Sequence, residues 1–189
     1  YHVDNNGRAG WKMQGLTGDR PLYNLLPLAT RPEAAVILVE GEKSADAAAI
    51  LFPDSVAVTT IGGSNGAGKT DFTPLAGRDV TIWADADEPG QKYAQDVAKR
   101  LLALPVPATV RILPPVCSSA GYAEESKQPI LLDGFTAPKG WDAADALAEG
   151  WTDEHAKLLT LPEPVASSVS PDAQPSGSLV QDFETPIGD

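Results

Sequence analysis

Short continuous apolar runs and longer segments with helical spacing alternate along this chain of 189 residues. A continuous apolar run of roughly four to eight residues is typical of a strand that is buried on both faces. The sequence therefore predicts strands at residues 34–41, 55–62, 78–87 and 108–115. Helical spacing predicts helices at residues 42–52, 88–104, 142–150 and 152–161.

The segment 88–104 carries the clearest helical signal. Its large apolar residues recur at intervals of three or four positions and so share one helix face. They are Tyr93, Val97, Leu101 and Leu104. Glu88 and Pro89 are residue types that suit the first turn of a helix, which places its start at the end of the preceding strand.

Strands that alternate with helices are typical of an α/β fold, in which helices cover both faces of a parallel sheet. We expect a mostly parallel four-stranded sheet flanked by helices, in a domain over residues 34–161. Residues 1–33 are glycine-rich and are predicted to be a short N-terminal arm or hairpin. Residues 116–138 have no clear period and are predicted to be an insertion or loop. Residues 162–189 are rich in proline, serine and acids, and are predicted to be a disordered tail or linker.

Composition limits the classes of protein to which the chain can belong. No apolar run approaches the ~20 residues of a membrane span, and the polar start does not resemble a signal peptide. The single cysteine, Cys117, excludes an internal disulfide and a cysteine-cluster zinc site, and fits a reducing cytoplasm. The net charge of −12 argues against a broad basic surface for nucleic acid, but clustered carboxylates can bind a divalent metal that faces phosphate. Because the first residue is Tyr1, we expect a fragment of a longer protein.

The stretch GSNGAGKT, residues 63–70, matches the phosphate-loop pattern G-x-x-x-x-G-K-[ST] at every position. A working phosphate loop lies between a strand and a helix that begins at the Lys-Thr pair. The strand is predicted, and an acid at the end of the next strand would also suit an ATPase. However, Pro74 and Gly77 interrupt any helix after Thr70, and an interior proline costs ~3 kcal/mol. A P-loop ATPase is therefore less favoured than a loop that joins the second and third strands and contacts phosphate.

Acidic residues end two of the predicted strands. Glu40 ends the first, and Asp85 and Asp87 end the third, where a period of two puts both aspartates on one side of the backbone. Because the carboxyl ends of parallel strands meet at one edge of a sheet, we expect these carboxylates to converge. Close like charges repel, and Mg²⁺ or Mn²⁺ would relieve that cost and serve phosphoryl transfer. The alternative is that Asp-x-Asp-x-Pro-Gly is ordinary turn and helix-cap chemistry.

Three stretches, in this order, resemble one known family: VILVEGEKSADAA, DVTIWADADEPGQKYA and KGWDAADAL. They are similar to the TOPRIM domain shared by bacterial-type primases, topoisomerases and some nucleases, and most similar to that of phage and plasmid primase-helicase proteins. The resemblance covers roughly residues 34–160, and RPLYNLLPL just upstream is similar to the lead-in of those proteins. It implies a TOPRIM-like fold and a nucleotidyltransferase of the DNA-primase type.

The resemblance also implies a role for each acid. Glu40 would act as a general acid/base or a metal-site carboxylate, and Asp85 and Asp87 would hold the catalytic Mg²⁺ or Mn²⁺. Asp142 and Asp145 match a later acidic motif of the primase branch and would join the metal site, but Asp142 is equally suited to cap the following helix. The implied partners are a nucleic-acid template, nucleoside triphosphates and a replicative helicase, in the cytoplasm and without a membrane.

Lys43, Lys69 and Lys92 lie in segments that flank these acids and are candidates for contact with phosphate or nucleic acid, although surface lysines are most often simply solvated. The sequence departs from the family in two ways. Ser44 stands where bacterial primases usually carry an aspartate, and the chain lacks the zinc-ribbon cysteines and basic template-holding region of complete primases. Independent priming by this chain is therefore not implied. A TOPRIM-type nuclease and a non-catalytic docking module of a replication helicase remain alternatives; a topoisomerase is less favoured, because its strand-transferring tyrosine normally lies in a separate domain.

Overall fold

The structure is a computed structural model, and it describes residues 2–3, 9–10, 18–114, 121–122, 129–130, 137–157, 159 and 161–166. Most of the predicted insertion, Cys117, and residues 167–189 of the predicted tail lie outside the described residues. Within the described part, no helix is both long enough and apolar enough to cross a membrane.

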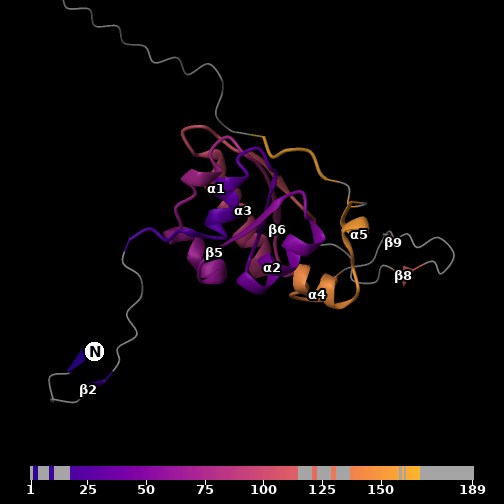
Figure 1. Cartoon of the computed structure of the whole chain (residues 1–189), viewed down its shortest axis with the longest axis horizontal. Helices are drawn as coiled ribbons and strands as arrows, with labels where there is room; N and C mark the ends of the chain where they lie inside the picture. The colour runs from indigo at the N-terminus through magenta and orange to yellow at the C-terminus, as the bar shows by residue number, and fades with distance from the viewer. Residues whose placement is uncertain are drawn as a thin grey trace, which may run out of the picture.

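A five-stranded sheet forms the centre of the domain (Figure 1). Its strands are β3 (Leu22–Tyr23), β4 (Val36–Val39), β5 (Val56–Thr60), β6 (Asp79–Trp83) and β7 (Thr109–Ile112). They lie in the order β3-β5-β4-β6-β7, and every neighbouring pair is parallel except β3 with β5. The predicted α/β fold with a mostly parallel sheet is therefore confirmed.

The predicted number of four strands is wrong, because β3 adds an antiparallel edge strand to the sheet. This strand comes from the segment predicted to be an arm, and α1 (Leu25–Thr30) follows it. A strand of two residues is too short to show a period of two, so it left no pattern to detect. The same N-terminal segment also contains β1 (His2–Val3), which pairs antiparallel with β2 (Ala9–Gly10).

Helices cover both faces of the sheet. One face carries α1, α3 (Glu88–Leu102) and two short 3₁₀ helices, η1 (Gly63–Lys69) and η2 (Thr73–Leu75). The other carries α2 (Glu42–Leu51), α4 (Ala143–Ala148) and α5 (Asp153–Lys157), with α2 and α4 side by side (Figure 1). Small strands β8 (Gly121–Tyr122) and β9 (Pro129–Ile130) pair with each other within the predicted insertion.

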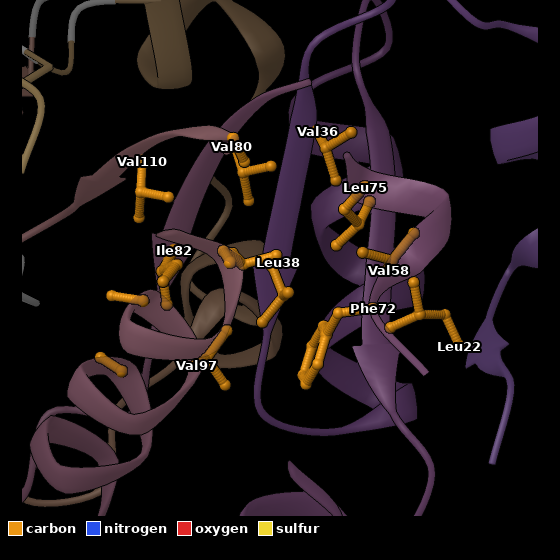
Figure 2. Close-up of a cluster of buried hydrophobic side chains, with 14 of the residues drawn as sticks. Leu22, Val36, Leu38, Val58, Phe72, Leu75, Val80, Ile82, Val97 and Val110 are labelled. Atoms are coloured by element: carbon orange, nitrogen blue, oxygen red, sulfur yellow. The ribbon is translucent and has the colours of Figure 1, made fainter. Parts of the chain in front are cut away.

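The alternation of side chains along β4 shows why the sheet needs two layers of helices. Val36 and Leu38 face the α3 side, whereas Ile37 and Val39 face the α2 side. All four are buried, and each contributes about 1.5–3 kcal/mol of hydrophobic stabilisation. Figure 2 shows the α3-side cluster, in which Val97 of the helix packs against Leu38 and Ile82 of the sheet.

The C-terminal boundary differs from the prediction in one respect. The backbone N–H of Val165 donates a hydrogen bond of 2.7 Å to the carbonyl oxygen of Val110 in β7. The segment 161–166 therefore returns to the edge of the sheet, although most of it was assigned to the tail.

The strand order defines a point where the chain changes direction across the sheet. From β4 the chain crosses through α2 to β5 on one side, whereas from β6 it crosses through α3 to β7 on the other side. Strands β4 and β6 are neighbours, so their carboxyl ends lie side by side at the point where the two crossovers diverge. Ligands of doubly wound α/β folds bind at such switch points.

Candidate functional site

Two of the predicted acids lie at this switch point. The register pairs Val39 of β4 with Trp83 of β6, so that Glu40 comes one residue and Asp85 two residues after a matched pair. Both acids are only partly exposed. The expected approach of Glu40 to Asp85 therefore follows from the register of two parallel strands.

The turn after Asp85 is held tightly against the start of α3. Asp87 is the N-cap of that helix, and its Oδ1 accepts a hydrogen bond of 2.8 Å from the N–H of Gly90. A Cβ atom at Gly90 would lie only 2.3 Å from the carbonyl oxygen of Asp85. A glycine is therefore required here so that the helix can approach the strand end.

A second segment, far along the chain, reaches the same turn. Ala86 donates from its N–H to the carbonyl oxygen of Trp141 at 3.0 Å and accepts from the N–H of Gly140 at 3.3 Å. These two bonds bring the start of α4 beside Asp85, and with it Asp142 and Asp145. The structure thus places Asp142 and Asp145 near Asp85, whereas their part in a metal site stays a prediction.

Asp142 and Asp145 also form a capping box at the start of α4. Oδ1 of Asp142 accepts from the N–H groups of Ala144 at 2.8 Å and Asp145 at 3.0 Å. Oδ2 of Asp145 accepts from the N–H of Asp142 at 3.3 Å. Capping chemistry is thus present at both residues, as the alternative interpretation expected, and it coexists with their place near Asp85.

Electrostatics identify Asp85 as the centre of the site. Its pKa is raised to about 7, first because burial disfavours the charged carboxylate and then because negative charges surround it. The neighbours that raise it are Glu40, Asp142, Asp87 and Asp145, in that order. We call these five residues the acidic cluster. Strongly perturbed acids in a cleft are typical of functional sites, although structural networks also produce them.

The acidic cluster fits a hard divalent cation by the chemistry of its donors, because carboxylate oxygens are the ligands that Mg²⁺ and Mn²⁺ prefer. A cation would also remove the repulsion that raises the pKa of Asp85. Among the described residues, however, no three side chains of His, Cys, Asp or Glu are already close enough to hold one ion. Coordination by three carboxylates would therefore require side chains to rotate.

The three candidate lysines differ in their position. Lys92 lies one turn into α3 and pairs with Glu88 at 2.6 Å, with both side chains largely exposed. Lys43 is exposed in the first turn of α2, three residues after Glu40, and lines a shallow groove between α2 and α4. Lys92 and Lys43 are therefore the two lysines close in sequence and structure to the strand ends.

Lys69 lies elsewhere. Its neighbour Gly68 is placed so that a Cβ atom would lie 3.7 Å from the guanidinium of Arg100. Arg100 is in the second half of α3, about 15 Å along the helix from Gly90 at a rise of ~1.5 Å per residue. The segment around Lys69 therefore lies beside the side chain of Arg100, whereas Asp85 packs against the first turn of α3.

The stretch GSNGAGKT forms η1 and, with η2, joins β5 to β6 as predicted. No α-helix begins at Thr70: its backbone is extended, and it forms a parallel bridge with Arg20. The Thr70 hydroxyl, which would face the metal in a phosphate loop, donates instead to the carbonyl oxygen of Gly66 at 2.9 Å. This local geometry differs from that of a phosphate loop and agrees with the lower preference for an ATPase.

Sequence reasoning missed a set of buried hydroxyl groups beside Glu40. Tyr93, Thr59 and Thr60 are buried and hydrogen-bonded at the carboxyl ends of β4 and β5. Tyr93 was assigned only to the apolar face of its helix. The signal that could have found it is chemical, because a buried tyrosine hydroxyl needs a hydrogen-bond partner.

Comparisons with known proteins give limited results. No family model matches the chain, and no curated protein matches it. Among solved structures, the chain is similar to the primase fragment of the bacteriophage T7 primase-helicase protein, with 20% sequence identity and a TM-score of 0.39. The match covers 66% of this chain and 41% of that chain.

Proposed function

We propose that the chain carries a metal-dependent site for nucleotidyl or phosphoryl transfer on nucleic acid, most specifically the TOPRIM part of a DNA primase from phage or plasmid replication. One observation carries the proposal. The carboxylates of the acidic cluster gather around Asp85 at the switch point of the sheet, where burial first and their negative charges second raise its pKa to about 7. Such an accumulation of negative charge is costly unless a cation is bound.

Each acid would have a role in this reaction. Asp85 and Asp87 would hold Mg²⁺ or Mn²⁺, and Glu40 would serve as a further ligand or move a proton at the attacking hydroxyl. The bound metal would supply positive charge that stabilises the transferring phosphoryl group. Asp142 and Asp145 would complete the acidic cluster from α4, with their capping bonds fixing the position of that helix.

The primase assignment rests on the resemblance of the three sequence motifs to the TOPRIM domain. A nucleic-acid template and nucleoside triphosphates would be the substrates, with Lys43 and Lys92 the better placed of the three lysines for phosphate contact. A replicative helicase domain or subunit would be the partner, in the cytoplasm.

The proposal is tested first by binding. Binding of Mg²⁺ and Mn²⁺ is measured by calorimetric titration of three proteins. They are the unmodified chain, Asp85→Asn/Asp87→Asn, and Asp54→Asn as a control. Asparagine is a good N-cap, so the double variant keeps the start of α3 while it loses two charges. Asp54 is exposed and lies at the opposite end of the sheet, just before β5.

We expect the unmodified chain and Asp54→Asn to bind the metal and the double variant not to bind. Primer synthesis on single-stranded DNA with nucleoside triphosphates is then compared with cleavage of DNA without them. Cleavage alone would indicate a TOPRIM-type nuclease. Metal-dependent primer synthesis by the double variant would contradict the assignment.

A non-catalytic docking module is the second candidate. It is favoured by the finding that, in the described part of the chain, no three potential metal-binding side chains are already close enough to hold one ion. Absence of Mg²⁺ and Mn²⁺ binding in the unmodified chain would support this candidate over the first.

A further inference from the structure

The carbonyl group that precedes Glu40 is held by two side chains from different elements. The oxygen of Val39 accepts a hydrogen bond of 2.7 Å from the hydroxyl of Thr59 in β5 and one of 3.1 Å from the hydroxyl of Tyr93 in α3. Thr59 is fully buried and Tyr93 is 3% exposed. The end of β4 is therefore fixed from both a neighbouring strand and the helix that packs on the sheet.

Tyr93 is also connected to the start of η1. Its hydroxyl lies 3.1 Å from that of Thr60, which donates to the carbonyl oxygen of Gly63 at 2.8 Å. Each hydroxyl carries one hydrogen, so with Tyr93 donating to Val39 and Thr60 donating to Gly63 the two hydroxyl oxygens are in contact without a hydrogen bond between them. A Cβ atom at Gly63 would lie 3.6 Å from the carbonyl oxygen of Glu40. The backbone of Glu40 therefore lies between the Val39 carbonyl, which Tyr93 and Thr59 hold, and the start of η1 at Gly63.

The same helix is fixed to the other half of the acidic cluster. Gly90, one turn before Tyr93, packs against the carbonyl group of Asp85 and donates to Asp87. Helix α3 therefore contacts the end of β6 with its first turn and the end of β4 with its second. A rigid helix bound at both points sets the separation of Glu40 from Asp85 and Asp87.

Burial is the main reason why the pKa of Tyr93 is raised to about 12, and the negative charge of Glu40 raises it further. The hydroxyl therefore stays protonated and remains a donor at every ordinary pH.

We propose that Tyr93 is a positioning residue, which holds the end of β4 so that Glu40 stays beside the strand end that carries Asp85 and Asp87, where rotation of the three side chains would let them share a divalent cation. This inference rests on the proposed function, because it concerns the same metal site. It assigns to Tyr93 no contact with substrate and no proton transfer. Its effect is exerted through the Val39 carbonyl.

Tyr93→Phe removes only the hydroxyl group. Thr59 still donates to Val39, and no buried donor is left without an acceptor. Tyr23→Phe is the matched control, since it removes a hydroxyl whose hydrogen bond of 2.9 Å goes to Asp46 on the exposed side of α2. Affinity for Mn²⁺ is measured from the electron paramagnetic resonance signal of the free ion. Both variants are also made in a Glu40→Gln background.

We expect Tyr93→Phe to weaken Mn²⁺ binding about tenfold, the lower end of the effect of residues that orient metal ligands. Tyr23→Phe should leave it unchanged. In the Glu40→Gln background, Tyr93→Phe should have no further effect. Equal affinity of Tyr93→Phe and the unmodified chain would overturn the inference, as would an equal loss in both backgrounds, which would indicate a general structural effect.

A second measurement separates this inference from the proposed function. The ¹³C signal of the Glu40 carboxyl group is recorded without metal in the unmodified chain and in both tyrosine variants. We expect a displaced signal in Tyr93→Phe and an unchanged one in Tyr23→Phe. If the unmodified chain binds no Mn²⁺, the proposed function fails, while a displaced signal would still support the positioning of Glu40. An undisplaced signal in Tyr93→Phe would refute it.

Discussion

Replacement of Asp85 by asparagine is expected to stabilise the metal-free protein. Asparagine keeps the size and polarity of the side chain but removes a negative charge that is repelled by four other carboxylates. Burial and these neighbours raise the pKa of Asp85 to about 7 from 3.8. Ionisation of Asp85 is therefore less favourable in the folded chain than in the unfolded chain, and folding becomes less favourable wherever the unfolded chain has lost this proton.

The magnitude follows from the two pKa values. Their difference corresponds to about 4 kcal/mol at ~1.36 kcal/mol per pH unit. Asp85 is partly exposed, so screening by solvent reduces this figure, and we take about 2 kcal/mol as the expected effect. The sign of this effect on folding stability is that of a carboxyl group whose pKa is raised by folding. The cost is absent below about pH 4, grows between about pH 4 and pH 7, and is complete above that range.

The assay is urea unfolding of Asp85→Asn and the unmodified chain without divalent metal, at about pH 8 and about pH 5. We expect the variant to be more stable by about 2 kcal/mol at the higher pH and by about a third of that at the lower. Comparison of the two proteins at each pH cancels the titration of other groups. Asp54→Asn should show no such gain.

A further expectation concerns added Mg²⁺, which should stabilise the unmodified chain more than the variant because a ligand stabilises only the state that binds it. If Asp85→Asn has the same stability as the unmodified chain at both pH values, or is less stable at about pH 8, the electrostatic reasoning is refuted.

Substitutions at Gly90, Asp142 and Lys69 test three further parts of the reasoning. Gly90→Ala places a Cβ atom 2.3 Å from a carbonyl oxygen and should cost about 1–3 kcal/mol in urea unfolding, whereas Gly41→Ala, with nothing within 4 Å, should cost less than ~1 kcal/mol. Asp142→Ala should lose about 1 kcal/mol through its cap and Asp142→Asn much less, while both should weaken Mn²⁺ binding in calorimetry. Lys69→Ala should leave Mn²⁺ affinity and primer synthesis unchanged within error; a severe loss would revive the ATPase interpretation.

The parts of the fold that the sequence predicted are those with a long or continuous pattern. Helix α3 begins at Glu88 as predicted, since its apolar residues repeat over about three turns and Pro89 marks its start. The buried strand β4 was visible as a continuous apolar run. In contrast, β3 has two residues, and the only evidence of its pairing is tertiary: the partner of Leu22 is Thr60, 38 positions away.

The strand-end acids could be predicted because parallel strands place their carboxyl ends together without any knowledge of side-chain packing. The contact of α4 with that edge could not be derived from periodicity. It depends on two backbone hydrogen bonds between Ala86 and the segment before α4, some 55 positions later. A backbone bond leaves no residue type to recognise, so only the resemblance to a family suggested it. Tyr93 was hidden for a related reason, because one residue serves both the apolar face and the hydroxyl network.

The structure also resolves why Asp142 could be interpreted in two ways from its sequence. Both capping hydrogen bonds from Ala144 and Asp145 end on Oδ1, so Oδ2 takes no part in the cap. A carboxylate can therefore orient a helix with one oxygen and contribute charge to the acidic cluster with the whole group. The negative charge of Asp142 is accordingly one of the causes of the raised pKa of Asp85. Capping and metal binding are thus compatible roles. Comparison of asparagine with alanine at this position separates them, because asparagine retains the capping oxygen while losing the charge.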